Sequence, residues 1–138
     1  MATASFVKYN AGVEALIEGI NAGTDTWRII LSNTAPDTAD AVQADAAELT
    51  TAGGYTVNGN ACSVTSSAQT AGTYKLVLGS PTAWTGSGAG FTIRYAILWD
   101  STANALVGYW DYGSSQLVGA GETFTVTLDS TNGVFQVA

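Results

Sequence analysis

The sequence contains no histidine and a single cysteine, Cys62. The absence of histidine excludes serine triads, Cys–His nucleophiles and histidine-ligated metal sites. A lone cysteine cannot form a disulfide within the chain, and it offers too few ligands for a structural zinc site. We therefore predict that Cys62 is a small buried side chain in the strand-like stretch ACSVT.

Charged residues are scarce as well: they make up 11% of the chain, against about 25% in an ordinary soluble domain. Four basic and eleven acidic residues give a net charge of −7, and Lys8, Arg28, Lys75 and Arg94 do not cluster in the sequence. Nucleic acids and anionic membranes require clustered cations, so we expect neither as a partner. A weakly charged surface loses little hydration energy when it packs against other protein, which suits a subunit of an assembly.

Long hydrophobic runs are missing too. No stretch approaches the roughly 18 apolar residues of a transmembrane helix, and the beginning MATASFVKYN lacks the basic and apolar segments of a signal peptide. We expect the chain to be made and folded in a cytoplasm. Its 138 residues fit a single domain, 1–138, with one hydrophobic core.

The first clear pattern is helical. Apolar residues recur at spacings of three and four, which predicts an amphipathic helix over residues 5–21. Two glycines inside it cost roughly 1 kcal/mol each relative to alanine, so packing must hold the helix in place. We expect it to pack on a sheet of its own chain, with an arm docked on a neighbouring subunit as the alternative. The apolar stripe consists of Phe6, Tyr9, Val13, Leu16, Ile17 and Ile20.

The rest of the chain favours β-strands. The stretch FTIRYAILW, residues 91–99, alternates apolar and other residues, which predicts a strand with its odd-numbered side chains on one face. Similar alternation occurs at residues 27–31 and 123–128, and residues 73–78 are a further expected strand. Residues 106–112 carry apolar side chains on both faces, which predicts a central or doubly covered strand. Asn58-Gly59 is a strong hairpin signal between short strands expected at 55–57 and 61–65. We predict an antiparallel β-sandwich, jelly-roll-like, of about seven or eight strands with one N-terminal helix, and residues 55–138 as its strand-rich core.

Residues 33–54 have few strand formers and little apolar mass. We predict a long surface loop there, with one short helical turn at residues 44–49. Loops of this length in a compact domain are often functional or become ordered against a partner.

Candidate chemistry is sparse. Asp100, Asp111, Glu122 and Asp129 could in principle form the paired carboxylates of a glycosidase, but most of them stand at strand ends or turns. The acidic turns 37–40 and 129–132 do not match a calcium-binding loop, and the glycine-rich residues 86–90 lead into a strand instead of the helix a phosphate loop needs. We predict no catalytic activity, no cofactor and no metal.

Aromatic residues supply the remaining candidates. Tyr109, Trp110, Asp111 and Tyr112 could stack on and hydrogen-bond a sugar, although alternation along a strand divides them between two faces. Core packing is favoured for Trp110 and Tyr112. Trp84, alone in a glycine-rich connection, is interpreted as a plug at the edge of the core or as an interface anchor. The candidate partner-contact residues are Phe6, Tyr9, Trp84, Tyr109 and Asp111.

The run RYAILWDSTANALVGYWDYGSSQLVGAGETFTV, together with SNTAP, GGYT and FVKYNAGVEALIEGI, resembles a family of small virion proteins of tailed bacteriophages. The resemblance covers most of the chain in order, and its motifs are not catalytic signatures. It implies a capsid decoration or cement protein on the outside of the head, which binds the major capsid protein as a homo-oligomer, dimeric or trimeric. The alternative is a tail, neck or fibre module that binds host glycans; an enzyme ranks behind both.

Overall fold

The computed structural model describes residues 4–138, which form a mainly β fold with one α-helix. All paired strands are antiparallel, and half of the ten strands are only two or three residues long. The elements are β1 (Phe6–Lys8), α1 (Asn10–Glu18), β2 (Trp27–Ser32), η1 (Gln43–Asp45), β3 (Asn60–Cys62), β4 (Val64–Thr70), β5 (Thr73–Leu78), β6 (Trp84–Thr85), β7 (Phe91–Asp100), β8 (Ala105–Val118), β9 (Thr123–Phe124) and β10 (Phe135–Val137).

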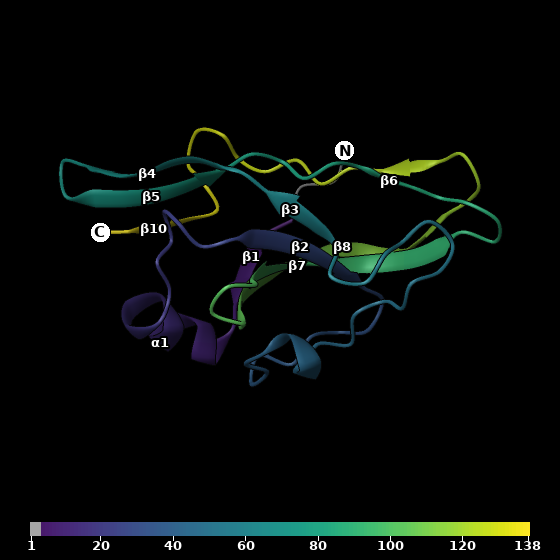
Figure 1. Cartoon of the computed structure of the whole chain (residues 1–138), viewed down its shortest axis with the longest axis horizontal. Coiled ribbons are helices and arrows are strands. Elements are labelled where there is room, and N and C mark those ends of the chain that lie inside the picture. Colours follow the sequence, from purple (N-terminus) through teal and green to yellow (C-terminus); the bar gives the residue numbers. More distant parts are fainter. Residues whose placement is uncertain (1–3) are drawn as a thin grey trace.

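The elements form three layers (Figure 1). The central layer is a five-stranded sheet in the order β1-β8-β7-β2-β3. Above it in Figure 1 lie a three-stranded sheet, β10-β5-β4, and the short pair β6-β9. Below it lie α1 and the loop that contains η1. The predicted antiparallel, sandwich-like architecture with a single helix is thus confirmed.

Each face of the central sheet has its own hydrophobic core, because both faces are covered. The main core lies between the two sheets and includes Trp27, Ile29, Leu76, Leu98 and Val107. A smaller core lies between the central sheet and the lower layer; its buried residues are Tyr9, Ile30, Ile97, Trp99 and Leu106. The central strands therefore carry apolar residues on both faces, as the sequence of β8 had indicated.

The predicted alternation along β7 is correct only in part. Phe91 and Ile93 face the main core, but Ile97 and Trp99 belong to the smaller core on the opposite face. The pairing of β7 with β8 is irregular between Ile93 and Tyr95: Ile93 lies opposite Gln116 and Tyr95 opposite Asp111, so β7 advances by two residues while β8 advances by five. Since side chains alternate with a period of two, such a break in register sends the following side chains of β7 to the other face.

The predicted helix over residues 5–21 is shorter than expected. Residues 6–8 form β1, which pairs with β8, and the helix runs only from Asn10 to Glu18. Gly12 is buried where α1 crosses β8: a Cβ there would stand 2.5 Å from the Leu106 carbonyl oxygen. The glycine that weakens the helix locally thus lets it approach the sheet. The expectation that the helix packs on its own sheet is confirmed.

The segment from 33 to 54 lies against the lower face of the sheet. Its helical turn is η1, Gln43–Asp45, one residue earlier and shorter than predicted. Leu106 donates its backbone N–H to the Ala41 carbonyl at 2.9 Å, and Leu49 donates to the Leu31 carbonyl at 2.9 Å. The segment is therefore ordered against its own chain without a partner.

Two further strand predictions were wrong. Residues 55–57 form no strand, and Tyr55 takes part only in an isolated bridge with Ala52. The alternating stretch 123–128 is assigned as a strand only at Thr123–Phe124, because the backbone beyond Phe124 has no ladder partner among the described residues. Asn58 and Gly59 do adopt the positive φ values, 76° and 58°, that their hairpin signal predicts.

Candidate functional site

Two of the five predicted partner-contact residues lie in the interior of the chain. Tyr9 is fully buried in the smaller core, where burial raises the pKa of its hydroxyl well above the ordinary value. Trp84 is buried in the main core, and its ring packs near Phe124 with the centroids 6.4 Å apart. For Trp84 the interpretation as a core plug is therefore correct. Neither ring is available to a partner.

The cluster at residues 109–112 is divided between two faces, as predicted. Tyr109 packs against the smaller core, 5.6 Å from the Tyr9 ring and 6.2 Å from the Tyr95 ring. Trp110 lies on the opposite face, 5.0 Å from the ring of Phe6. Phe6 fits there because Gly108 has no side chain: a Cβ would stand only 2.0 Å from the Phe6 ring.

Trp110 and Tyr112 line a cleft of about 390 Å³, which we call the aromatic cleft. Its floor is formed by the inner face of the central sheet, and its walls are formed by Ala4 and Phe6 and by the segment after β9. Core packing was predicted for both residues. Trp110 is half-buried and packs against the main core, whereas Tyr112 is 41% exposed. The lining residues are Ala4, Phe6, Ile93, Arg94, Ala96, Trp110, Tyr112, Phe124, Thr125, Val126, Thr127, Leu128, Asp129, Gly133 and Val134.

An ion pair stands at the rim of this cleft. Arg94 donates two hydrogen bonds to Asp111, Nε to Oδ1 at 2.9 Å and a terminal nitrogen to Oδ2 at 3.0 Å. Gly113, at φ 103°, also donates its N–H to Asp111 Oδ1 at 2.8 Å. Arg94 and this N–H lower the pKa of the Asp111 carboxyl. Asp111 thus holds the irregular stretch of β8 around Gly113, and that is the role the structure gives to this predicted contact residue.

A second hollow, which we call the apolar groove, lies between β1, α1 and β10 and has a volume of about 530 Å³. β1 and β10 are each the last strand of their sheet, so each has one edge without a partner among residues 4–138. Ile17, beside the groove residue Val13 on the helix surface, is 78% exposed. The groove is lined by Phe6, Val7, Lys8, Val13, Leu16, Val107, Phe135, Gln136 and Val137.

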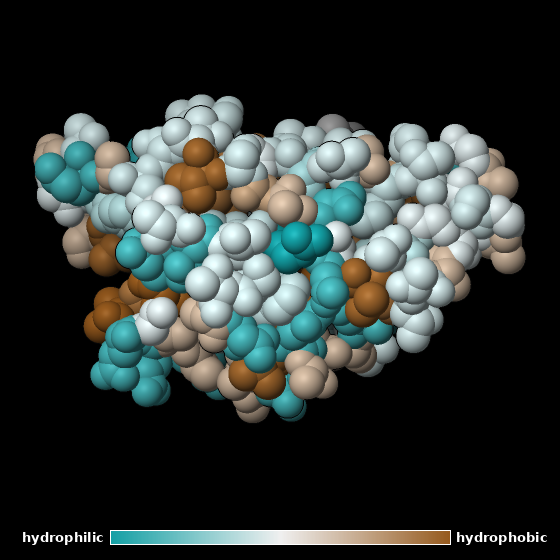
Figure 2. Space-filling view, viewed as in Figure 1, coloured by the Kyte–Doolittle hydropathy of each residue, from teal (hydrophilic) through white to brown (hydrophobic). Residues whose placement is uncertain are grey.

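The exposed apolar residues concentrate around this groove. Val7, Val13, Ile17 and Val137 are four of the seven large hydrophobic residues exposed on the described surface. Figure 2 shows many pale residues, as expected for a surface rich in Ser, Thr and Gly; brown apolar atoms occur at the lower left, where Figure 1 places α1, and in a few other groups on this face. Sequence periodicity placed Val13 and Ile17 on the buried stripe, but the helix turns its Gly12–Leu16–Ile20 side to the sheet instead.

The carboxylates considered for catalysis each have a structural partner. Glu122 accepts the N–H of Gly119 at 2.9 Å, and Asp129 accepts the N–H groups of Thr131 and Asn132 at 2.8 Å. No cluster of three or more potential metal-ligating side chains (His, Cys, Asp, Glu) occurs within residues 4–138. None of the helices described is long and apolar enough to cross a membrane.

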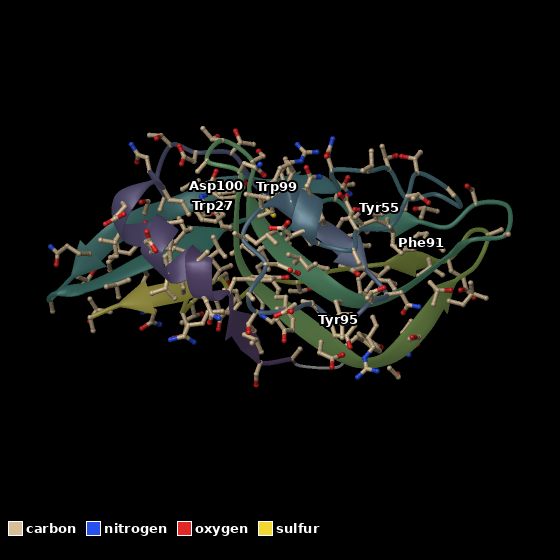
Figure 3. The ribbon with its side chains drawn as sticks, turned by 90° about the horizontal axis from the view of Figure 1, so that it is seen from below. Trp27, Tyr55, Phe91, Tyr95, Trp99 and Asp100 are labelled. Atoms are coloured by element: carbon tan, nitrogen blue, oxygen red, sulfur yellow. The ribbon has the colours of Figure 1, made fainter. Side chains whose placement is uncertain are left out.

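Asp100 is the exception, because one of its two carboxylate oxygens accepts no hydrogen bond from a described residue. Its Oδ1 accepts the N–H groups of Thr102 and Ala103, at 2.9 and 3.0 Å, which closes the turn between β7 and β8. Its Oδ2 is buried without a hydrogen-bond partner among the described residues. Burial, with the neighbouring Asp25 carboxyl, raises the pKa of Asp100 to about 6. Figure 3 shows Asp100 at the end of its strand beside Trp27 and Trp99.

Sequence reasoning missed both hollows. Each combines segments from opposite ends of the chain, since Phe6 meets residues after 124 in the one and residues after 134 in the other. Comparison with known proteins finds no matching family, no matching curated protein and no matching solved structure.

Proposed function

We propose that this chain is a structural protein of a tailed-bacteriophage virion, and that it acts as a capsid decoration or cement protein. The observation that carries the proposal is the apolar groove with its two open strand edges. Exposed apolar side chains next to unpaired backbone groups are typical of surfaces that bind other protein. The resemblance of the sequence to small virion proteins supports the same reading.

The wider surface suits adhesion. Only 11% of the residues are charged, and among the described residues that line the groove Lys8 alone carries a charge. A partner can therefore cover the groove with little cost from burying charge. The proposed partner is the major capsid protein on the outside of the head.

The mechanism follows from mass action. A protein that binds only the assembled shell stabilises the shell by RT ln(1 + [L]/Kd) at each site. A dimer or trimer on a local symmetry axis would contact several capsid subunits at once and convert modest contacts into avidity. We propose such a homo-oligomer, without a nucleic acid or membrane partner.

The test is co-sedimentation of the purified chain with expanded heads of its own phage that lack it. We expect saturable attachment and a higher disruption temperature of the decorated heads. Ile17→Glu places a charge beside the groove without opening the core, because Ile17 is 78% exposed. It should reduce attachment at least about tenfold, a change of about 1.4 kcal/mol.

Leu117→Glu is the matched control, since Leu117 is 64% exposed on β8 and does not line the groove. It adds the same charge and should leave attachment unchanged. A chain that never sediments with heads, and that electron microscopy finds in isolated tails, would replace this proposal with the tail, neck or fibre alternative.

A further inference from the structure

The aromatic cleft offers unpaired polar groups beside aromatic side chains. Trp27 and Trp99 donate their indole N–H groups to Ala22 and Asn104, at 2.9 and 3.1 Å. The indole N–H of half-buried Trp110, which lines the cleft, makes no hydrogen bond to another described residue. This N–H is thus an unpaired polar group of the cleft within the described part of the chain.

The wall formed by residues 125–127 also carries unpaired polar groups. Backbone N–H and C=O groups of residues 125–127 bond to no other described residue, and the side chains of Thr125 and Thr127 add two exposed hydroxyls. Tyr112 also lines the cleft, 6.1 Å from the Phe124 ring, and its hydroxyl is likewise unpaired within residues 4–138. The cleft therefore combines unpaired donors and acceptors with aromatic surface.

Charge narrows the ligand class. The Arg94 guanidinium is neutralised by its two bonds to Asp111, and the other charged lining residue, Asp129, is acidic. The chain as a whole carries a charge of −7. An anionic ligand would meet no free cation among the described lining residues, whereas a neutral polyhydroxylated one meets hydrogen-bonding groups and aromatic faces.

Size narrows it further. At about 390 Å³ the cleft falls within the range of roughly 300–1,000 Å³ that is usual for small-ligand sites. An extended peptide strand would find only three unpaired residues along the wall, against the roughly five or six of an ordinary strand. A small ligand fits this wall better than a strand does.

We propose that the aromatic cleft binds a short neutral saccharide, stacked on Trp110 and Tyr112 and hydrogen-bonded to the wall at residues 125–127. This site goes beyond the proposed function and does not depend on it, because it lies apart from most of the apolar groove and shares only Phe6 with it. A virion protein with such a site would hold the particle to host or environmental glycans.

The experiment is an array of neutral and anionic oligosaccharides probed with the full chain, followed by an NMR titration with the best neutral glycan. We expect that glycan to shift the Trp110 indole N–H and the amides of residues 125–127. Tyr112→Ala, at an exposed position, should weaken binding at least about tenfold. Trp110→Phe keeps an aromatic face but loses the N–H, so it should bind more weakly than the parent and fold normally.

Leu117→Ala is the control, because Leu117 lies on the same strand as Tyr112 and outside the cleft. Its binding should equal that of the parent. The inference is overturned if no neutral saccharide shifts these signals at about 10 mM, a Kd range worth less than about 3 kcal/mol. It is also overturned if Tyr112→Ala binds as well as the parent, or if only anionic glycans bind.

Discussion

Asp100→Asn should make this protein more stable at neutral pH and remove a pH dependence of its unfolding. The structure keeps the carboxyl of Asp100 buried with one oxygen unpaired and the Asp25 carboxyl beside it. Asparagine retains the oxygen that accepts the N–H groups of Thr102 and Ala103. Its amide nitrogen can donate to Asp25, where the parent has only a proton to share.

The expected gain in the free energy of unfolding follows from the raised pKa of Asp100. The folded state raises the pKa of Asp100 from 3.8 to about 6, so the folded chain binds this proton more tightly than the unfolded chain. Protonated Asp100 therefore contributes its full stabilisation below about pH 4, and this stabilisation is lost as pH rises through about 6. At higher pH the free energy of unfolding no longer changes because of Asp100. One pKa unit corresponds to about 1.4 kcal/mol, which sets an upper value of about 3 kcal/mol. Water near the exposed part of Asp25 reduces this to about 1–2 kcal/mol.

The assay is urea unfolding of parent and variant at steps from pH 4 to pH 7.5, followed by tryptophan fluorescence. The difference in unfolding free energy should grow in favour of Asp100→Asn as pH rises and level off above about pH 6. Using the difference cancels the opposite contributions of Asp45, Asp111 and Asp129, whose pKa values are lowered. Glu14→Gln, on the exposed side of α1, is the charge-matched control. A difference that does not change with pH would refute the reasoning.

Three further outcomes are expected. Gly12→Ala should lower the free energy of unfolding by about 1–3 kcal/mol in urea titrations, because its methyl group overlaps the backbone of β8; an unchanged midpoint would contradict that contact. Burial raises the pKa of the Cys62 thiol to about 12, so iodoacetamide should modify it only in denaturant, and rapid native modification would be the opposing result. Tyr55→Phe removes a hydroxyl that donates to Glu48 and accepts the Leu31 N–H at 3.1 Å; we expect a loss of about 1–3 kcal/mol by calorimetry, and an equally stable variant would argue against the network.

The fold class could be read from the sequence because the strands of the central sheet carry strong local patterns. β2, β5 and β7 alternate or consist of apolar residues, and their predicted ranges agree with the structure within two residues. The shift at Arg94 could not be predicted, since a bulge depends on how β8 pairs with β7 and leaves no mark on the alternation of β7 itself.

The prediction for residues 5–21 was partly wrong for a related reason. Phe6 and Tyr9 fit the helical spacing, so periodicity joined them to α1, but pairing with β8 draws residues 6–8 into the sheet. Tyr9 then enters the smaller core, and Val13 and Ile17 are left on the surface. The apolar groove therefore depends on the pairing of residues 6–8 with β8, a contact between distant segments that the local sequence pattern does not predict.

The pairing of β1 with β8 has a consequence for how the protein is made. Phe6 lies opposite Trp110, more than a hundred positions later in the chain. During synthesis β1 therefore has no strand partner, and Phe6 and Val7 stay uncovered, until about a hundred further residues have been made. Such distant contacts make folding slow, and a nascent chain released early would expose the same edge that the finished protein offers to its neighbours.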